Sequence, residues 1–382
     1  MRILMTTDSV GGVWPYSLEL CKALAEHDCE IVLACMGGKL HPAERRQALI
    51  LPNVTLHESS FRLEWMEEPW DDVPRAARWV ASLLESSGAD VLHLNSYGPA
   101  MQRFEVPILL VSHSCVHSWW RATRGGDPDA SWKRYRQCVI RALCAADRVI
   151  APTAAHLFAF SQCYEEVNLN GRAGVIHNGI DVTRWSSARL PGTHFVLGVG
   201  RVWDEAKNLR QLAAVAPALD APVMIAGNGD LDRHGGATGV VLLGNLPRAQ
   251  LVPYFRRAAA FAHPARYEPF GLAVLEAALS ACPLVLGDIP TLRELWHDAA
   301  LFVEPDDTRT LRMHLERLLA DPHERRRLGH AARTRALRYS ASAMAEAYAA
   351  EYRKLAGAAE EPLYRPATLH STTGQPGTTA IQ

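Results

Sequence analysis

Two glutamates in the second half of the chain are placed to bind a polar ligand. Glu268 comes just before a predicted helix that begins near Gly271, and Glu276 lies within that helix. Carboxylates accept hydrogen bonds from ligand hydroxyls, and the backbone N–H groups that begin a helix, here at 270–272, favour a phosphate or sugar oxygen. The alternatives are structural: Glu268 as a favourable charge near a helix N-terminus, and Glu276 as a solvated helix position.

Two cations lie where the predicted strand run at 194–202 gives way to a helix. Arg201 and Lys207 belong to this connecting segment, where their side chains can converge on a pair of phosphates. Arginine offers a fork of N–H donors and lysine a point charge. The alternative is that both are solvated surface cations.

Glycines mark two further strand-to-helix turns. Gly11 and Gly12 follow the first predicted strand, at 2–7, and allow an anionic ligand to approach the N-terminus of the next helix. Asn228 lies between two glycines after the predicted strand at 221–227. Because a tight turn explains each glycine pair equally well, neither identifies a ligand by itself.

Composition and charge argue against several classes of protein. Lys and Arg number 40 against 41 Asp and Glu, and a formal net charge of −1 is unlike that of a dedicated nucleic-acid binder. No apolar run approaches the roughly 20 residues that span a bilayer, and the first residues become polar too soon for a signal peptide. The eight Cys and 16 His show no metal-ligand spacing. We therefore expect a cytoplasmic protein without a structural metal.

The apolar runs predict a doubly wound α/β architecture. Several are near-continuous Val, Ile and Leu stretches, typical of strands buried on both faces of a parallel sheet, and helical patterns separate them. The predicted strands are 2–7, 30–36, 54–58, 90–95, 107–113, 147–152, 174–177, 194–202, 221–227, 240–244, 258–264, 283–287 and 300–303. The series restarts after about residue 180, which predicts two Rossmann-like domains facing each other across a cleft, with ligands at the carboxyl ends of the strands.

The predicted boundaries divide the chain into four parts. One Rossmann-like domain covers 1–178 and a second covers 179–340, which ends in a basic helix that we expect to be exposed. A further helix is predicted at 341–356. Residues 357–382 are rich in Pro, Gly, Thr and Ala and lack an apolar period, so we expect them to be disordered.

Together these motifs resemble the retaining glycosyltransferases of family 4, which have the GT-B fold of two Rossmann-like domains. The family signature has two glutamates separated by seven residues, with Pro-Phe-Gly after the first, as in 268–276. Gly200 and Arg201, followed by Lys207, are similar to the family's phosphate-binding loop. The shared order of these motifs favours the functional interpretation over the structural alternatives.

Two weaker motifs extend the resemblance to the N-terminal half. Gly11 and Gly12 are similar to the family's amino-terminal glycine loop, and the segment 175–181 resembles its domain junction. The family often has Pro at the position where His177 stands. The resemblance covers about residues 1–356.

The resemblance implies a role for each domain and for the matching residues. The N-terminal domain would bind the acceptor and the C-terminal domain the nucleotide-sugar donor, with the helix at 341–356 returning toward the N-terminal domain. Arg201 and Lys207 would neutralise the diphosphate, and Glu276 would accept from the ribose hydroxyls. Glu268 would hold hydroxyls of the transferred sugar. The other implied donor contacts are Gly11, Gly12, Asn228, Phe270, Gly271 and Leu272.

The acceptor side is marked by fewer residues. His113 resembles the family's amino-domain histidine near the reacting sugar, which adds it to the catalytic set of Glu268, Arg201 and Lys207; Asn95 would line the same side. The alternative for His113 is a structural role, in which the domain itself supplies the hydrogen-bond partners of the ring. Trp119 and Trp120, beside several cations, suit a sugar face, an anionic acceptor or peripheral contact with the inner face of the membrane. We favour a helix with a solvated basic face, because isolated charge runs usually face solvent.

The implied function is transfer of a sugar, with retention of configuration, from a nucleoside-diphosphate donor to an unidentified acceptor such as a glycan, a lipid-linked intermediate or a small metabolite. A UDP-sugar is the first expectation, ahead of GDP and ADP donors. No cofactor or metal is expected, because protein cations neutralise the diphosphate. The alternatives are a GT-B epimerase or phosphorylase, and a non-catalytic sugar-nucleotide-binding or partner subunit. The sequence predicts no oligomeric state.

Overall fold

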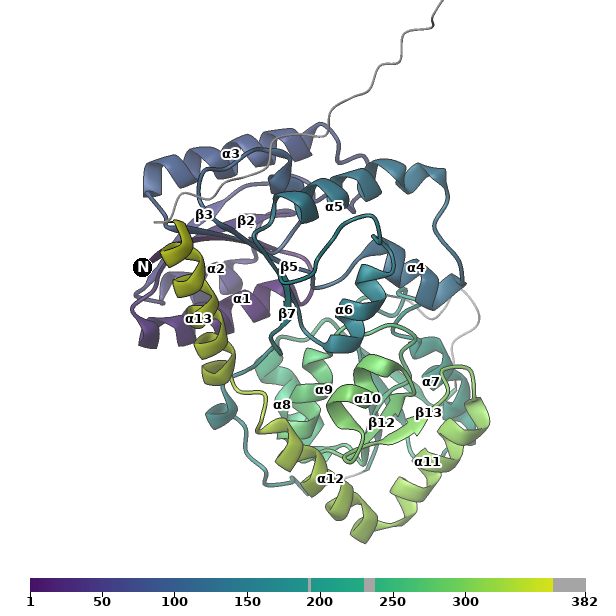
Figure 1. The fold of residues 1–382 in the computed structure, drawn as a ribbon. Helices are drawn as coiled ribbons and strands as arrows, with labels where there is room; N and C mark the ends of the chain where they lie inside the picture. Colours follow the sequence, from purple (N-terminus) through teal and green to yellow (C-terminus); the bar gives the residue numbers. More distant parts are fainter. Residues whose placement is uncertain (192–193, 230–237, 360–382) are drawn as a thin grey trace, which may run out of the picture.

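The computed structural model describes residues 1–191, 194–229 and 238–359 of the 382-residue chain. It contains two parallel sheets flanked by helices, and Figure 1 shows the two resulting domains one above the other. The predicted fold class, two doubly wound Rossmann-like domains, is confirmed. Each predicted apolar run contains a strand. The inner strands are buried between helices on both faces of the sheet, whereas the edge strands at 54–58, 173–175 and 240–244 are partly exposed.

The N-terminal domain is built on a seven-stranded sheet of order β3-β2-β1-β4-β5-β6-β7. Its strands are β1 (Arg2–Asp8), β2 (Glu30–Met36), β3 (Val54–Glu58), β4 (Val91–Leu94), β5 (Ile108–Val111), β6 (Arg148–Ala151) and β7 (Ala173–Val175). Its α-helices are α1 (Val13–Leu24), α2 (Pro42–Leu49), α3 (Asp72–Ser87), α4 (Val116–Arg124), α5 (Lys133–Ala145) and α6 (Ala154–Ser161). The 3₁₀ turns are η1 (Ala25–His27), η2 (Gly98–Met101) and η3 (Ala130–Trp132).

The C-terminal domain has a six-stranded sheet of order β10-β9-β8-β11-β12-β13. Its strands are β8 (Val196–Val199), β9 (Val223–Ala226), β10 (Val240–Gly244), β11 (Ala260–His263), β12 (Leu284–Gly287) and β13 (Leu301–Val303). Its α-helices are α7 (Leu209–Val215), α8 (Arg248–Arg257), α9 (Leu272–Leu279), α10 (Pro290–Trp296), α11 (Thr308–Ala320) and α12 (Pro322–Ala336). The 3₁₀ turns are η4 (Val182–Arg184) and η5 (Ala216–Ala218), and α13 (Ala341–Ala359) ends the described chain.

Both sheets reverse their strand order at an equivalent place. The reversal lies between β1 and β4 in the first sheet and between β8 and β11 in the second. Neighbouring loops at such a switch point leave on opposite faces of the sheet and open a crevice at the carboxyl ends of the strands, where ligands bind. The topology therefore predicts ligand binding at the carboxyl ends of β1 and β4 in the first sheet and of β8 and β11 in the second.

The last helix, α13, crosses back to the N-terminal domain. It lies beside α1 in Figure 1, and its Tyr348 and Tyr352 are fully buried in the same core cluster as Ile3 of β1. The chain crosses at a parallel bridge between Ile180 and Ser340. Within the described part of the chain, no helix has both the length and the apolar composition needed to cross a membrane.

Two expectations about the C-terminal segments need correction. The basic helix is not simply exposed: Leu328 and Ala332 of α12 are buried, and Arg333 donates to the Leu279 carbonyl. Basic residues here satisfy helix-end carbonyls of the domain as well as facing water. The predicted disordered tail begins too early, because α13 continues to Ala359, and the remainder of the 357–382 prediction, 360–382, lies outside the described residues.

Candidate active site

The glycine loop after β1 faces the C-terminal domain. Gly11 has φ +86°, and a Cβ added there would lie 3.2 Å from Arg201 Nη1. A Cβ on Gly12 would lie 3.9 Å from Leu272 Cδ1. At Gly11, only glycine adopts this backbone without strain and leaves the space beside Arg201 open. The loop predicted to approach the donor thus lies against two of the predicted donor residues of the other domain.

The start of the glycine loop is held by Asp8, the last residue of β1. Its Oδ1 accepts from the Val10 N–H at 2.8 Å, and the side chain is buried. Burial raises the pKa of Asp8 to about 7, with a further contribution from nearby Glu64, whereas Arg201 lowers it. The predicted first strand, 2–7, ends one residue before Asp8, to which the sequence analysis assigned no role.

The predicted phosphate loop holds its arginine by an internal ion pair. Arg201 Nη2 lies 2.7 Å from Asp204 Oδ2, and its guanidinium packs over the Trp203 ring at 5.1 Å. Asp204 is buried and also accepts from the Ala206 N–H at 3.0 Å. The side chain of Arg201 is 42% exposed, so it is fixed in direction yet open to an anion.

Lys207 and Glu268 form a largely buried ion pair. Lys207 Nζ lies 2.6 Å from Glu268 Oε2, and His263 Nε2 lies 2.9 Å from the same oxygen. Burial alone would raise the pKa of Glu268, but Lys207 and His263 outweigh burial and hold that pKa well below its ordinary value. Glu268 is therefore an ionised hydrogen-bond acceptor, and both of these contacts use its Oε2.

The segment from Gly271 into α9 positions the second glutamate. Gly271 precedes the helix with φ +89°, which allows the sharp entry after Glu268. Glu276 is 8% exposed, so the alternative of a solvated helix position is wrong. Its Oε1 lies 2.6 Å from Arg248 Nε, and Arg248 Nη1 also lies 2.6 Å from Glu19 Oε1.

The pair formed by Asn95 and His113 lies just beyond the carboxyl ends of β4 and β5 in the N-terminal sheet. Asn95 Nδ2 donates to the Thr6 carbonyl at 2.7 Å, which turns its Oδ1 toward His113 Nε2, also at 2.7 Å. His113 Nε2 therefore carries a proton and donates to Asn95. Burial lowers the pKa of His113 to about 3, with smaller contributions from His93 and His156. The imidazole is neutral at physiological pH.

The two tryptophans predicted on the acceptor side lie on α4, at the contact between the domains. Trp119 Nε1 donates to Asp204 Oδ1 of the phosphate loop at 3.2 Å. Arg124 packs over the Trp120 ring at 4.5 Å and pairs with Glu205 at 3.2 Å. Through Trp119 and Arg124, α4 therefore contacts the phosphate loop of the other domain, and the acceptor-side role of the two tryptophans stays a prediction.

The loop that carries Asn228 packs on the phosphate loop. The Asn228 carbonyl accepts from the Val202 N–H at 2.9 Å, and its side chain is exposed. A Cβ on Gly227 would overlap the Gly200 carbonyl, and one on Gly229 would lie 2.8 Å from Val202 Cβ. These glycines therefore allow two loops of the protein to approach each other, which is the structural alternative to ligand approach.

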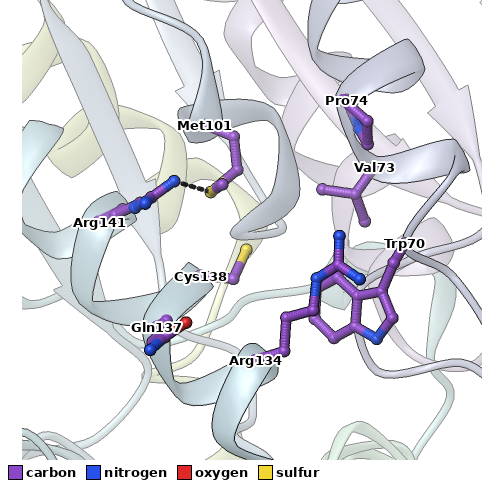
Figure 2. A pocket seen from close by; sticks show the side chains of 8 residues that line it. All are labelled: Trp70, Val73, Pro74, Met101, Arg134, Gln137, Cys138 and Arg141. Atoms are coloured by element: carbon purple, nitrogen blue, oxygen red, sulfur yellow. Dashed lines mark hydrogen bonds between the residues drawn. The ribbon is translucent and has the colours of Figure 1, made fainter.

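A separate pocket of about 250 Å³ lies in the N-terminal domain, away from these residues (Figure 2). In Figure 2, Arg134 lies over the Trp70 ring, at 4.7 Å, and Arg141 points toward Met101. The lining residues come from the start of α3, from η2 and from α5. They are Trp70, Val73, Pro74, Met101, Arg134, Gln137, Cys138 and Arg141.

Sequence reasoning missed several residues that complete the site. Asp204, His263 and Arg248 each contact a predicted residue directly, and Glu19 contacts Arg248. The first two lie beside recognised motifs, so their proximity was a usable signal. Glu19 and Arg248 are 229 positions apart and meet only through the fold.

The fold and the site together define a glycosyltransferase of the GT-B type. Residues 10–184 match the family model described as Glycosyltransferase Family 4, and residues 180–335 match Glycosyl transferases group 1. A glycogen synthase of Mycobacterium tuberculosis is 33% identical, and the match covers 88% of this chain and 90% of that protein. The chain belongs to this family of glycosyltransferases.

Solved structures of low sequence identity show the same fold. The sucrose-phosphate synthase of Thermosynechococcus elongatus superposes with a TM-score of 0.76 at 22% identity, covering 94% of this chain and all of that one, 100%. HepE of Anabaena, solved in complex with UDP-glucose, gives a TM-score of 0.72 at 17% identity, covering 93% and 99%.

Proposed function

We propose that the protein transfers a sugar from a nucleoside-diphosphate donor to an acceptor hydroxyl, with retention of configuration. The observation that carries the proposal is the convergence of Arg201, Lys207 and Glu268 at the switch point of the second sheet, with Gly11 of the first domain facing Arg201. The leaving nucleoside diphosphate gains negative charge. Cations and helix N–H groups already fixed in place stabilise such charge without reorganisation.

Each charged residue then has a distinct role. Arg201, directed by Asp204 and facing the glycine loop, lies where a diphosphate would meet both domains. Lys207 contacts both that diphosphate and Glu268. Glu268 stays ionised and accepts hydrogen bonds from hydroxyls of the transferred sugar. Glu276, deeper on α9, accepts from the ribose. The neutral His113 faces this site from the acceptor side.

We propose that the donor is a UDP-sugar and that the reaction needs no metal. The solved complex of HepE with UDP-glucose and the glycogen synthase relative support a glucosyl donor. In the described part of the chain, no three His, Cys, Asp or Glu side chains are grouped as metal ligands. Arg201 and Lys207 would then supply all the positive charge that the diphosphate needs.

The test begins with a thermal-shift panel of UDP, GDP, ADP and dTDP, with and without EDTA. A nucleotide at 100 times its Kd adds about 2.7 kcal/mol of stability. We expect one nucleotide to be selected, with the shift unchanged by EDTA and reduced in Glu276→Ala. Absence of a shift with all four nucleotides would contradict the proposal.

Catalysis and stereochemistry need a second measurement. The matching nucleotide-glucose is incubated with and without a glucan primer, and release of the nucleoside diphosphate is followed together with the anomeric proton signals of the product. We expect an α-linked product from an α-linked donor. Binding without release of the nucleoside diphosphate would instead favour a non-catalytic sugar-nucleotide-binding subunit.

A further inference from the structure

One guanidinium joins the proposed ribose glutamate to the other domain. Arg248, at the start of α8, lies 2.6 Å from Glu276 through Nε and 2.6 Å from Glu19 through Nη1. Glu276 belongs to the C-terminal domain, whereas Glu19 lies on α1, directly after the glycine loop. The same arginine therefore contacts the proposed ribose glutamate and helix α1 of the other domain.

The network holds two negative charges and one positive charge in a largely buried place. Side-chain exposure is 8% for Glu19, 10% for Glu276 and 31% for Arg248. Burial raises the pKa of Glu276, Arg248 lowers it, and Glu19 raises it again. Without Arg248, burial and the neighbouring carboxylate would together favour protonated Glu276.

Other charged groups near α9 have different partners. From α12, Arg333 donates to the Leu279 carbonyl, and from β11, His263 lies beside Glu268. Among the described residues, Arg248 is thus the cation that pairs with Glu276. A carboxylate forms stronger hydrogen bonds with ribose hydroxyls when it is ionised.

The bridge is anchored at both ends. The Arg248 guanidinium packs over the Trp185 ring at 5.4 Å, and Glu19 Oε2 accepts from the Asp181 N–H at 3.0 Å. Asp181 lies at the junction between the domains, where it also pairs with Lys22 of α1 at 2.7 Å. The position of Arg248 is therefore set by the contact between α1, the junction and α8.

We propose that Arg248 is a positioning residue for the donor nucleotide: it keeps Glu276 ionised and directed at the ribose, and through Glu19 it makes nucleotide affinity depend on the contact between the two domains. This inference rests on the proposed function, which supplies the role of Glu276. It goes further because it makes the ribose contact of Glu276 depend on Arg248 and Glu19, two residues outside the family motifs.

The first test compares UDP affinity in the wild type, Arg248→Gln and Arg257→Gln by calorimetry between pH 6.5 and 9. Arg257 is an exposed arginine on the same helix and serves as the matched control. We expect Arg248→Gln to weaken UDP binding about tenfold at pH 7. This is the usual effect when one hydrogen bond, here from a ribose hydroxyl to Glu276, loses its charged acceptor. The ratio to wild type, which cancels titration of UDP itself, should recover as pH rises and Glu276 ionises.

A second variant separates this role from a merely structural one. Glu19→Gln added to Arg248→Gln removes the repelling carboxylate, so the double variant should bind UDP more tightly at pH 7 than Arg248→Gln alone. Arg248→Lys should restore part of the affinity. If Arg248 only supported packing, the double variant would be weaker still and its loss would not vary with pH.

The outcomes distinguish this inference from the proposed function. UDP binding to Arg248→Gln at the wild-type level, or a loss that is constant with pH and not relieved by Glu19→Gln, overturns the role of Arg248 alone. If the wild type binds none of UDP, GDP, ADP and dTDP, the proposed function fails first and the inference fails with it.

Discussion

The buried ion pair of Lys207 and Glu268 contributes to the stability of the free protein. The two charges lie 2.6 Å apart with little exposure. Loss of Lys207 would leave Glu268 with His263 as its remaining partner in a site poor in water, and an uncompensated buried charge is strongly destabilising. Lys207 therefore stabilises this site in the free protein, apart from its proposed role toward the diphosphate.

We expect Arg201→Ala and Lys207→Ala each to lower turnover at least ~100-fold, by analogy with the loss of one transition-state donor. The measurement is release of nucleoside diphosphate at saturating donor. Arg210→Ala, an exposed arginine just after the phosphate loop, is the control and should keep wild-type turnover. Near wild-type rates in both site variants would refute the assignment of these cations.

A buried histidine makes stability sensitive to acid. Burial lowers the pKa of His156 to about 4, below its ordinary value of 6.5. Between these values the unfolded chain binds a proton that the native state does not, so His156 contributes stability that is present above pH 6.5 and lost as pH falls toward 4.

We expect His156→Gln to reduce the loss of stability between pH 7 and pH 5 by about 2 kcal/mol relative to wild type. Urea unfolding at the two pH values measures this difference, and Asp8, whose raised pKa has the opposite effect, is common to both proteins. The same substitution at exposed His330 serves as the matched control. Equal slopes for wild type and His156→Gln would contradict the expectation.

At the scale of elements, the turn after β1 combines a special backbone with a neighbour from the other domain. Gly11 and Gly88 both have positive φ, +86° and +59°, but only Gly11 has a nearby side chain, Arg201 Nη1 at 3.2 Å from the added Cβ. Nothing lies within 4 Å of the Cβ position of Gly88. A comparison of alanine substitutions at these two glycines therefore distinguishes the cost of backbone strain from the effect of a methyl group on Arg201.

We expect Gly11→Ala and Gly88→Ala to cost similar stability, about 1 kcal/mol or somewhat more, because alanine is strained at positive φ. Only Gly11→Ala should also weaken nucleotide binding and turnover, since its methyl group displaces Arg201. The thermal midpoint and UDP affinity of both variants give the comparison. Equal UDP affinity in the two would show that the glycine loop does not face the donor.

The positions of the strands and of the motif residues follow from local signals in the sequence. Continuous Val, Ile and Leu runs predict the strands, and the glutamate pair lies within nine residues, 268–276, on one turn and one helix. The environment of Glu276 was not predictable in this way. Arg248 and Glu19 lie on other helices, and neither has a sequence pattern that distinguishes it from a surface charge.

The residue that Trp119 contacts could not be predicted from the local sequence either. An aromatic residue beside cations suits a ligand and a protein contact equally well, because both use the indole ring and its N–H. The placement of α4 opposite the phosphate loop, where Trp119 donates to Asp204, shows the protein contact, and a role toward the acceptor stays a prediction. Local spacing predicts what an element can present, whereas the arrangement of the two domains decides what it meets.

In the whole molecule, the two domains touch through several kinds of contact. Glu294 of α10 accepts from the first N–H groups of α6, at Ala154 and Ala155, with distances of 2.9 and 2.8 Å. The hydroxyl of Tyr267 lies 2.9 Å from Ser118 Oγ, on α4. Together with the Arg248 bridge, these contacts hold the glycine loop opposite the donor residues.

Because α13 follows the C-terminal domain in sequence yet packs on the N-terminal one, the stability of the first domain depends on the far end of the chain. Tyr352 of α13 is fully buried, and its hydroxyl lies 2.5 Å from His93 Nδ1 of β4. The ring fills the core next to Tyr348. A substitution here should therefore act on a domain more than 150 residues earlier.

We expect Tyr352→Ala to destabilise the N-terminal domain by about 3–5 kcal/mol, the usual cost of removing a large buried ring. Tyr352→Phe keeps the ring, loses only the hydrogen bond to His93, and should cost about 1 kcal/mol. Urea unfolding followed by the fluorescence of tryptophans in each domain measures both. Because Glu276, Lys207 and Glu268 lie in the other domain, UDP should still stabilise the C-terminal transition of Tyr352→Ala, though more weakly without its glycine loop. Equal costs for the alanine and phenylalanine variants would mean that α13 does not support the N-terminal core.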